Sequence, residues 1–151
     1  MSHPASTKFH VKRDYPLGAV VSVIFDGTRF LTIKRSQHVK APGAIGFAGG
    51  GVEPDETQAE AIVREMQEEL GVAVTAVKGV WTCRTPRGVE LNFWQVRFVG
   101  EQTIKIDPNE VEFYTWHTPS SLREQFNLIS SAVPFLDAWE SGEVELVDDP
   151  S

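Results

Sequence analysis

The spacing of apolar residues along the chain separates predicted strands from predicted helices. Runs rich in β-branched and aromatic residues predict strands at residues 18–25, 29–34, 72–81, 90–99 and 111–117. A further short strand is predicted at residues 47–48, before a run of three glycines. Because Asp26-Gly27 is a turn signal, the first two strands are predicted to pair as an antiparallel hairpin. Residues 85–88 predict the turn between the two longest strands.

The apolar spacing becomes helical between residues 57 and 71. Thr57 and Glu60 form a capping-box pattern, and Gly71 stands where a helix often ends in the left-handed conformation. The apolar positions between them form one stripe, which predicts that one side of the helix packs against a sheet. The residues of this stripe are Ala59, Ile62, Val63, Met66 and Leu70.

Two more helices are predicted near the end of the chain. The first begins at residues 119–122, with a proline in its first turn. The second covers about residues 129–139, and either starts near Pro134 or is kinked there. Strands and helices then follow one another in an order that predicts an α/β fold, with a mixed sheet and helices on both faces.

Composition and charge narrow the class of protein. The chain has 151 residues, of which 41% are hydrophobic and 23% charged, as in a soluble globular protein of one domain, with residues 1–14 as a loose arm. No apolar run is long enough to span a membrane and the start lacks a signal core, so we expect a cytoplasmic protein. A net charge of −7 argues against long nucleic acid as a partner. Cys83 is the only cysteine, so no internal disulfide can form.

Three carboxylates lie on one side of the predicted helix. Glu65, Glu68 and Glu69 are spaced i, i+3 and i+4, so they share a face. Like charges placed side by side are unfavourable unless a cation lies among them, and Mg²⁺ or Mn²⁺ prefers oxygen ligands. An ordinary charged surface helix is the alternative interpretation, but only Arg64 is near enough to compensate the stripe. The pattern therefore favours a metal site built on a helix.

The segment from Gly50 to Val72 resembles the signature of the Nudix (MutT-like) hydrolases, G-x5-E-x7-R-E-U-x-E-E-x-G-U, in which U is a bulky aliphatic residue. Met66 and Val72 occupy the aliphatic positions, and the fixed positions are all matched, by Gly50, Glu56, Arg64, Glu65, Glu68, Glu69 and Gly71. The resemblance implies an α/β/α sandwich with a mixed central sheet. It also implies hydrolysis of a diphosphate that links a nucleoside to another group, X.

The resemblance implies a role for each residue of the signature. Glu65, Glu68, Glu69 and the backbone carbonyl of Gly49 are expected to bind Mg²⁺ or Mn²⁺, and Glu68 or Glu69 to help position the attacking water. Arg64 is expected to hold Glu65 or a loop carboxylate in place. The remaining signature residues are expected to be structural, with Glu56 paired to Arg64 across the turn, and these are Gly50, Glu56 and Gly71.

The general base is left open between several acids. Some family members take it from a loop after the sheet, where Glu110 is the first candidate, Glu112 the second and Asp107 a third. Both glutamates could instead be solvated surface acids. In other relatives a glutamate of the signature is the base.

The expected substrate is small, phosphorylated and derived from a nucleotide. Arg35 could contact a phosphate, and the residues around it partly match the coenzyme A pyrophosphatase branch of the family. Arg84 could do the same from a hairpin, and one tryptophan could stack on a base. Coenzyme A or an acyl-CoA is therefore an alternative substrate, a non-catalytic nucleotide sensor is an alternative function, and a homodimer is left open.

Overall fold

The computed structural model describes residues 15–148, so the arm predicted at residues 1–14 lies outside the described residues. Strands and helices follow one another much as the apolar pattern predicts. The strands are β1 Ala19–Val23, β2 Phe30–Arg35, β3 Ile45–Gly46, β4 Gly49–Gly51, β5 Val74–Arg84, β6 Glu90–Phe98 and β7 Val111–His117. The helices are α2 Gln58–Leu70, α3 Pro119–Arg123 and α4 Ala132–Glu140.

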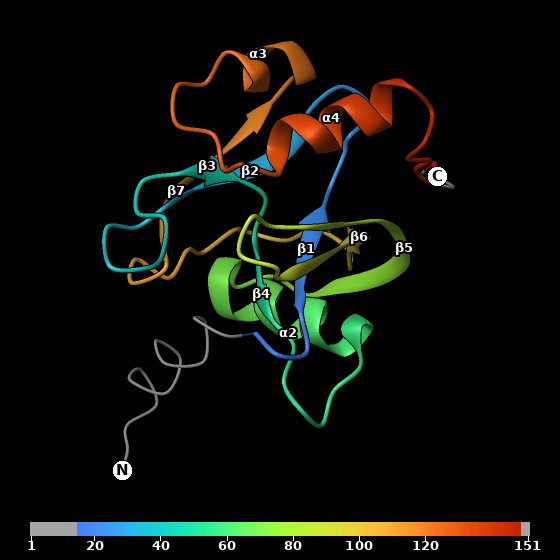
Figure 1. The fold of residues 1–151 in the computed structure, drawn as a ribbon. Helices are drawn as coiled ribbons and strands as arrows, with labels where there is room; N and C mark the ends of the chain where they lie inside the picture. The colour runs from blue at the N-terminus through green and yellow to red at the C-terminus, as the bar shows by residue number, and fades with distance from the viewer. Residues whose placement is uncertain (1–14, 149–151) are drawn as a thin grey trace.

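The strands form two sheets. One has the order β4-β1-β6-β5 and the other β3-β2-β7. β1 runs parallel to β6 and antiparallel to β4, so the larger sheet is mixed, as predicted. α2 lies on one side of the sheets, and α3 and α4 lie on the other (Figure 1). The predicted α/β fold with helices on both faces is therefore confirmed.

The predicted antiparallel hairpin between the first two strands forms only next to its turn and does not extend along β1 and β2. The turn forms, because the Asp26 carboxylate accepts hydrogen bonds from the main chain of Thr28 and Arg29. Beyond it, however, pairing is limited to one bridge between Phe25 and Phe30. Both edges of β1 are already occupied by β4 and β6, so β2 joins the other sheet instead.

The predicted strand at residues 47–48 is also wrong. Two shorter strands flank this position, β3 in one sheet and β4 in the other, and the chain crosses between the sheets at Phe47 and Ala48. Both residues are buried, which explains why they resemble a strand in sequence. Burial alone does not distinguish a strand from a buried crossing.

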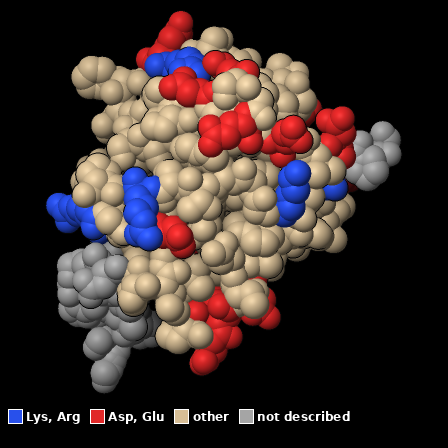
Figure 2. Space-filling model, turned by 45° about the vertical axis from the view of Figure 1, so that its right-hand side comes forward, with Lys and Arg blue, Asp and Glu red and all other residues tan. Residues whose placement is uncertain are grey.

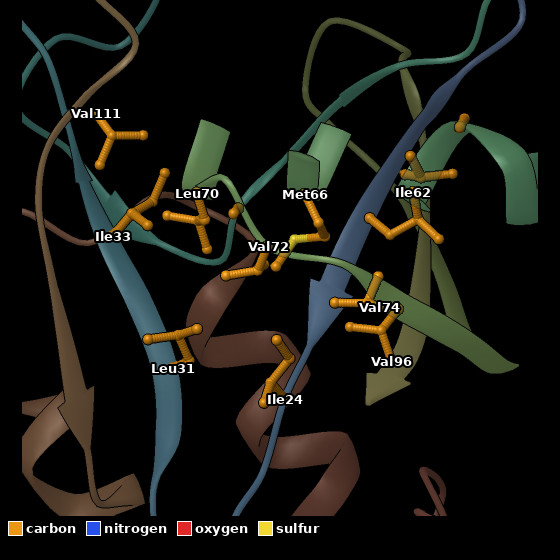
Figure 3. Close-up of a cluster of buried hydrophobic side chains, with 13 residues drawn as sticks. Ile24, Leu31, Ile33, Ile62, Met66, Leu70, Val72, Val74, Val96 and Val111 are labelled. Atoms are coloured by element: carbon orange, nitrogen blue, oxygen red, sulfur yellow. The ribbon is translucent and has the colours of Figure 1, made fainter. Parts of the chain in front are cut away.

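A separate hydrophobic core lies on each face of the sheets. The core on the α2 side is aliphatic and is drawn in Figure 3, where Ile62, Met66 and Leu70 of α2 lie among valines and isoleucines of the strands. The core on the α4 side contains a cluster of phenylalanine rings among aliphatic residues. There the rings of Phe93 and Phe135 are stacked, with centroids 4.9 Å apart.

Helices α2 and α4 differ in detail from their predicted patterns. In α2, Ala61 is buried while Val63 is partly exposed, so the predicted stripe is shifted around the helix. α4 begins at Ala132, which places Pro134 in its first turn, where a missing N–H costs no helical hydrogen bond. Within residues 15–148, no helix has the length and apolar character needed to cross a membrane.

Candidate active site

The ends of α2 are determined by local side-chain chemistry. Thr57 accepts a hydrogen bond from the Glu60 main chain, and the Glu60 carboxylate accepts one from the Thr57 main chain. The predicted capping box is therefore confirmed. At the other end, Gly71 has a φ of 63°, the left-handed conformation predicted for it. These two caps fix the position of the acidic face relative to the sheets.

Two of the three stripe carboxylates are buried. Glu65 is 2% exposed and Glu69 is 4% exposed, and they are the only buried carboxylates in the part of the chain that the structure describes. The side chain of Glu68, in contrast, is 42% exposed. Burial of a carboxylate is unfavourable unless a positive group or hydrogen-bond donors compensate it. A plain surface helix does not explain Glu65 and Glu69.

Arg64 lies among the acids and holds several of them. Its guanidinium donates to both carboxylate oxygens of Glu56, at 2.6 and 3.0 Å, and to the Gly51 carbonyl at 2.9 Å. It also donates to Glu65 at 3.0 Å and to Glu68 at 3.3 Å. The expected Glu56–Arg64 pair is therefore present. This pair lowers the pKa of Glu56 and raises that of Arg64.

Several carboxylates are gathered around Arg64. The single guanidinium of Arg64 is within 4.0 Å of four carboxylates, those of Glu53, Glu56, Glu65 and Glu68. The Oε1 atoms of Glu65 and Glu69 are enclosed and accept no hydrogen bond. Among residues 15–148, no three His, Cys, Asp or Glu side chains converge closely enough to enclose a metal ion. The oxygen donors of these carboxylates nevertheless fit a divalent cation.

The glycines before α2 allow the acids to approach the sheet closely. A Cβ at Gly50 would overlap the Glu65 carboxylate, and a Cβ at Gly49 would overlap the Val20 carbonyl. β4 pairs with β1 through these glycines, so the buried end of Glu65 lies directly against the sheet. Gly50 therefore has a steric role that any other residue would disturb.

Most of the chain matches a known protein family. The NUDIX domain model matches residues 15–139, which is most of the chain. The chain belongs to the NUDIX family. It is thus a hydrolase that acts on pyrophosphate bonds.

Three similar proteins illustrate the match. The CTP pyrophosphohydrolase of Escherichia coli is 32% identical over 124 residues, which cover 80% of this chain and 88% of that protein. An ADP-ribose pyrophosphatase of Methanocaldococcus jannaschii is 35% identical over 106 residues, covering 66% of this chain and 62% of its own. The structure of a MutT NUDIX hydrolase from Burkholderia pseudomallei aligns with a TM-score of 0.66 at 21% identity, over 79% of this chain and 94% of its own. That last similarity concerns the fold alone.

The loop before β7 is attached to the end of the acidic helix of this NUDIX hydrolase. The main chain of Asp107 donates to the Glu69 carbonyl at 3.0 Å, and that of Lys105 donates to the Leu70 carbonyl at 2.8 Å. These bonds satisfy two carbonyls that the last turn of a helix leaves open. These contacts could not be predicted from the sequence, because main-chain donors do not depend on the type of residue.

The loop acids differ in their surroundings. Glu110 lies directly before β7, as predicted, and three residues after the main-chain contact of Asp107 with the helix end. Glu112 instead lies 3.4 Å from the Lys34 ammonium across the β2–β7 pair. The structure therefore separates the two candidates, because only the loop of Glu110 is attached to the acidic helix.

The two candidate substrate arginines contact their own loops. The side chain of Arg35 donates to the Lys40 carbonyl at 2.6 Å, and its main chain bonds with Ala44. Arg84 donates to the Gly88 carbonyl at 2.9 Å, within its own hairpin. The structure does not bring either guanidinium into a described contact with the acids of α2.

The face drawn in Figure 2 shows how charged side chains are distributed on that side of the molecule. On the face drawn in Figure 2, lysines and arginines occur in separate groups, with acidic side chains between them. A duplex or an extended strand requires a continuous basic surface. This face is therefore unlike a binding surface for long nucleic acid.

Proposed function

We propose that the chain is a Mg²⁺- or Mn²⁺-dependent pyrophosphohydrolase that cleaves a small nucleoside diphosphate derivative. The observation that carries this proposal is the burial of Glu65 and Glu69 on the acidic helix, with the Glu65 carboxylate directly against the glycine turn of β4. Carboxylate oxygens gathered in this way are the ligands that a divalent cation such as Mg²⁺ or Mn²⁺ prefers. The match to the NUDIX signature and family model supports the same conclusion.

The residues of α2 divide into ligands and a positioning residue. Glu65, Glu68, Glu69 and the carbonyl of Gly49 would hold the metal, which when bound neutralises the diphosphate and activates water. Arg64 holds Glu65 and Glu56 at fixed distances, so we assign it to positioning rather than to substrate contact. Gly50 gives the Glu65 carboxylate its space, and Gly71 ends the helix.

We assign the general base to Glu110. Its loop is attached to the end of α2 through Asp107, whereas Glu112 is paired with Lys34. A base must reach the attacking water, so an acid on a loop attached to the ligand helix is better placed than one on the far strand. Glu110→Gln should lower kcat, and its pH–rate profile should lose its acid limb. Glu112→Gln is the matched control, and equal loss in both variants would contradict the assignment.

The names of two relatives indicate which class of substrate to test first. The E. coli relative is named for CTP and the archaeal relative for ADP-ribose, both of which contain a nucleoside joined to a chain of phosphates. We therefore propose a nucleotide of this class, in which Arg35 or Arg84 contacts a phosphate once its loop opens. Nucleoside triphosphates would yield a monophosphate and pyrophosphate.

A substrate panel with a metal titration tests the proposal. The panel contains CTP, dCTP, oxidised deoxynucleoside triphosphates, ADP-ribose, GDP-mannose, a dinucleoside polyphosphate and coenzyme A. Hydrolysis that requires Mg²⁺ or Mn²⁺ and is nearly abolished in Glu68→Gln supports the proposal. Glu101→Gln, an exposed acid in the loop after β6, is the control. Wild-type rates in Glu68→Gln would contradict the metal role.

Binding without turnover would have a different meaning. If calorimetry shows that the protein binds Mg²⁺ and a nucleotide but cleaves no member of the panel, the chain is a nucleotide sensor. Preferential hydrolysis of coenzyme A would instead assign it to the coenzyme A branch. The same measurements therefore distinguish the proposed enzyme, a nucleotide sensor and a coenzyme A pyrophosphatase.

A further inference from the structure

The four edges of the two sheets are protected to very different extents. An exposed strand edge presents unpaired N–H and C=O groups, and proteins usually shorten, bulge, charge or cover it. β4 is an edge of only three residues. β5 is an edge with two register shifts and the exposed Lys78 between them. β3 is covered, because Ile45 exchanges main-chain hydrogen bonds with Asn127 and Ile129.

The fourth edge, β7, has none of these protections over residues 113–117. Its only irregularity lies before this stretch, at the shift between Lys34 and Arg35 on its neighbour β2. The hydrogen bonds described for the main chain of residues 112–117 all come from β2, through strand pairing and through the Thr32 hydroxyl, which donates to the Thr115 carbonyl at 3.0 Å. Two large side chains are exposed here, Phe113 at 44% and Tyr114 at 40%.

Main-chain hydrogen bonds alternate in direction along β2, and this alternation shows which N–H and C=O groups of β7 point away from β2. Leu31 donates to Ile24 and Arg35 donates to Ala44, so the odd-numbered residues of β2 direct their main-chain groups away from β7. Thr32, between them, is directed toward its partner Thr115. By alternation, the N–H and C=O groups of Tyr114 and Trp116 point to the open edge.

We infer that the β7 edge pairs antiparallel with β7 of a second copy of this chain, about a two-fold axis at Thr115. This register uses all five regular residues and places Tyr114 opposite the partner's Trp116, both with outward main-chain groups. Phe113 then lies opposite the partner's His117, and Thr115 opposite its own copy. No charged residue faces a like charge, and aromatic cross-strand pairs stabilise such sheets. A six-stranded sheet would continue through both protomers, from β3 to β3 of the partner.

A small cavity beside this edge supports a partner of the same kind. It has a volume of about 110 Å³ and is lined by Phe113, Thr115 and His117 of β7, with Thr32 and Lys34 of β2. The proposed register brings the partner's Phe113 next to His117, at the mouth of this cavity. Burial lowers the pKa of His117, which disfavours the charged form of the ring and suits an aromatic neighbour.

Sedimentation equilibrium over a range of protein concentrations tests the pairing. Because the interface is small, we expect dissociation in the micromolar range, about 10 µM. Tyr114→Lys places a charge on the edge and should raise the dissociation constant by at least tenfold. Val99→Lys, at another exposed hydrophobic residue away from the edge, should leave it unchanged. Circular dichroism confirms that both variants fold.

A disulfide tests the register independently of stability. In a Cys83→Ser background, Thr115→Cys should form a cross-linked dimer on mild oxidation, because a pair on the axis without main-chain hydrogen bonds brings its Cβ atoms close. Thr75→Cys on the β5 edge is the control and should form no cross-linked dimer. A wild-type chain that remains monomeric at high concentration, or equal cross-linking from both positions, would overturn the inference.

Discussion

The two faces of the sheets are packed by different chemistry. On one face, α2 combines an aliphatic core with the buried carboxylates of Glu65 and Glu69. On the other face, α4 packs phenylalanines and tryptophans, and no buried charged group belongs to this core within residues 15–148. Both faces anchor a helix, but only the aromatic face does so without an electrostatic cost. We therefore expect stability to depend mainly on the α4 face and chemistry mainly on the α2 face.

This comparison makes its strongest prediction for Glu65. Glu65→Gln keeps the shape of the side chain but removes its charge, so kcat/KM should fall by about 10³-fold or more, as expected for a lost metal ligand. The free energy of unfolding should change less than in a large-to-small core substitution, because the amide keeps the size of the side chain and an oxygen that can accept from Arg64. Steady-state kinetics and urea unfolding measure the two effects. A large loss of stability with unchanged kinetics would reverse the roles of the two faces.

For Phe135, in contrast to Glu65, a substitution is expected to lower stability and to leave activity nearly unchanged. This fully buried ring contacts Phe30, Phe47 and Phe93, and Phe135→Ala should lower the free energy of unfolding by about 3–5 kcal/mol. Activity per folded molecule at low temperature should stay near that of the wild type. Phe126→Ala, at a fully exposed ring, should change stability by no more than about 0.5 kcal/mol. Thermal unfolding of both variants gives the comparison.

Gly50→Ala sharpens the comparison, because it adds one methyl group against Glu65. The carboxylate must move to make room, so kcat/KM should fall by about 10- to 100-fold through misplacement of a ligand. Gly79→Ala, where a Cβ would meet only ordinary van der Waals contacts, should leave kcat/KM unchanged. Kinetics of the two variants under saturating Mg²⁺ measure this difference. Equal effects would show that the close approach at Gly50 has no catalytic meaning.

A smaller effect is predicted from the Glu56–Arg64 pair, which contributes to stability on the α2 face. The folded state lowers the pKa of Glu56, so it binds fewer protons than the unfolded chain. The contribution of the pair is complete above the ordinary value of 4.5 and is lost as the pH falls below it. Glu56→Gln should lower the free energy of unfolding by about 1–3 kcal/mol at neutral pH. It should also flatten the acid side of the stability–pH curve, which unfolding at several pH values would show.

The smallest expected effect concerns Arg84. Its hydrogen bond to Gly88 stays within the hairpin, so Arg84→Gln should raise KM by no more than a few-fold and leave kcat unchanged. A loss of kcat comparable to that of Glu65→Gln would place this arginine in the catalytic machinery. Kinetics with the preferred substrate of the panel decide the matter.

Elements with local signals could be predicted from sequence. Thr57, Glu60 and Gly71 define the ends of α2 through contacts within one helical turn, and the structure places both caps where they were expected. The β7 strand likewise has the predicted bounds. The spacing of Glu65, Glu68 and Glu69 also located the candidate site, because i, i+3 and i+4 fix a common face.

Features that depend on distant parts of the chain were less predictable. The pairing of β2 depends on which strands occupy the edges of β1, and β6 lies some seventy residues further along the chain. The burial of Glu65 and Glu69, and the exposure of Val63, depend on how α2 lies against the sheet. Neither Lys34–Glu112 nor the contacts of Lys105 and Asp107 with the helix end follow from a local pattern.

The attachment of residues 105–107 to the end of α2 limits how the protein can change in length. An added residue near Gly100 and Glu101, which are exposed and lie before this attachment, can be accommodated at the surface. A deletion within residues 105–107 would leave the carbonyls of Glu69 and Leu70 without their donors and release the helix end. Natural variants of this connection should therefore differ in length on its outer side and keep a constant number of residues between Lys105 and β7.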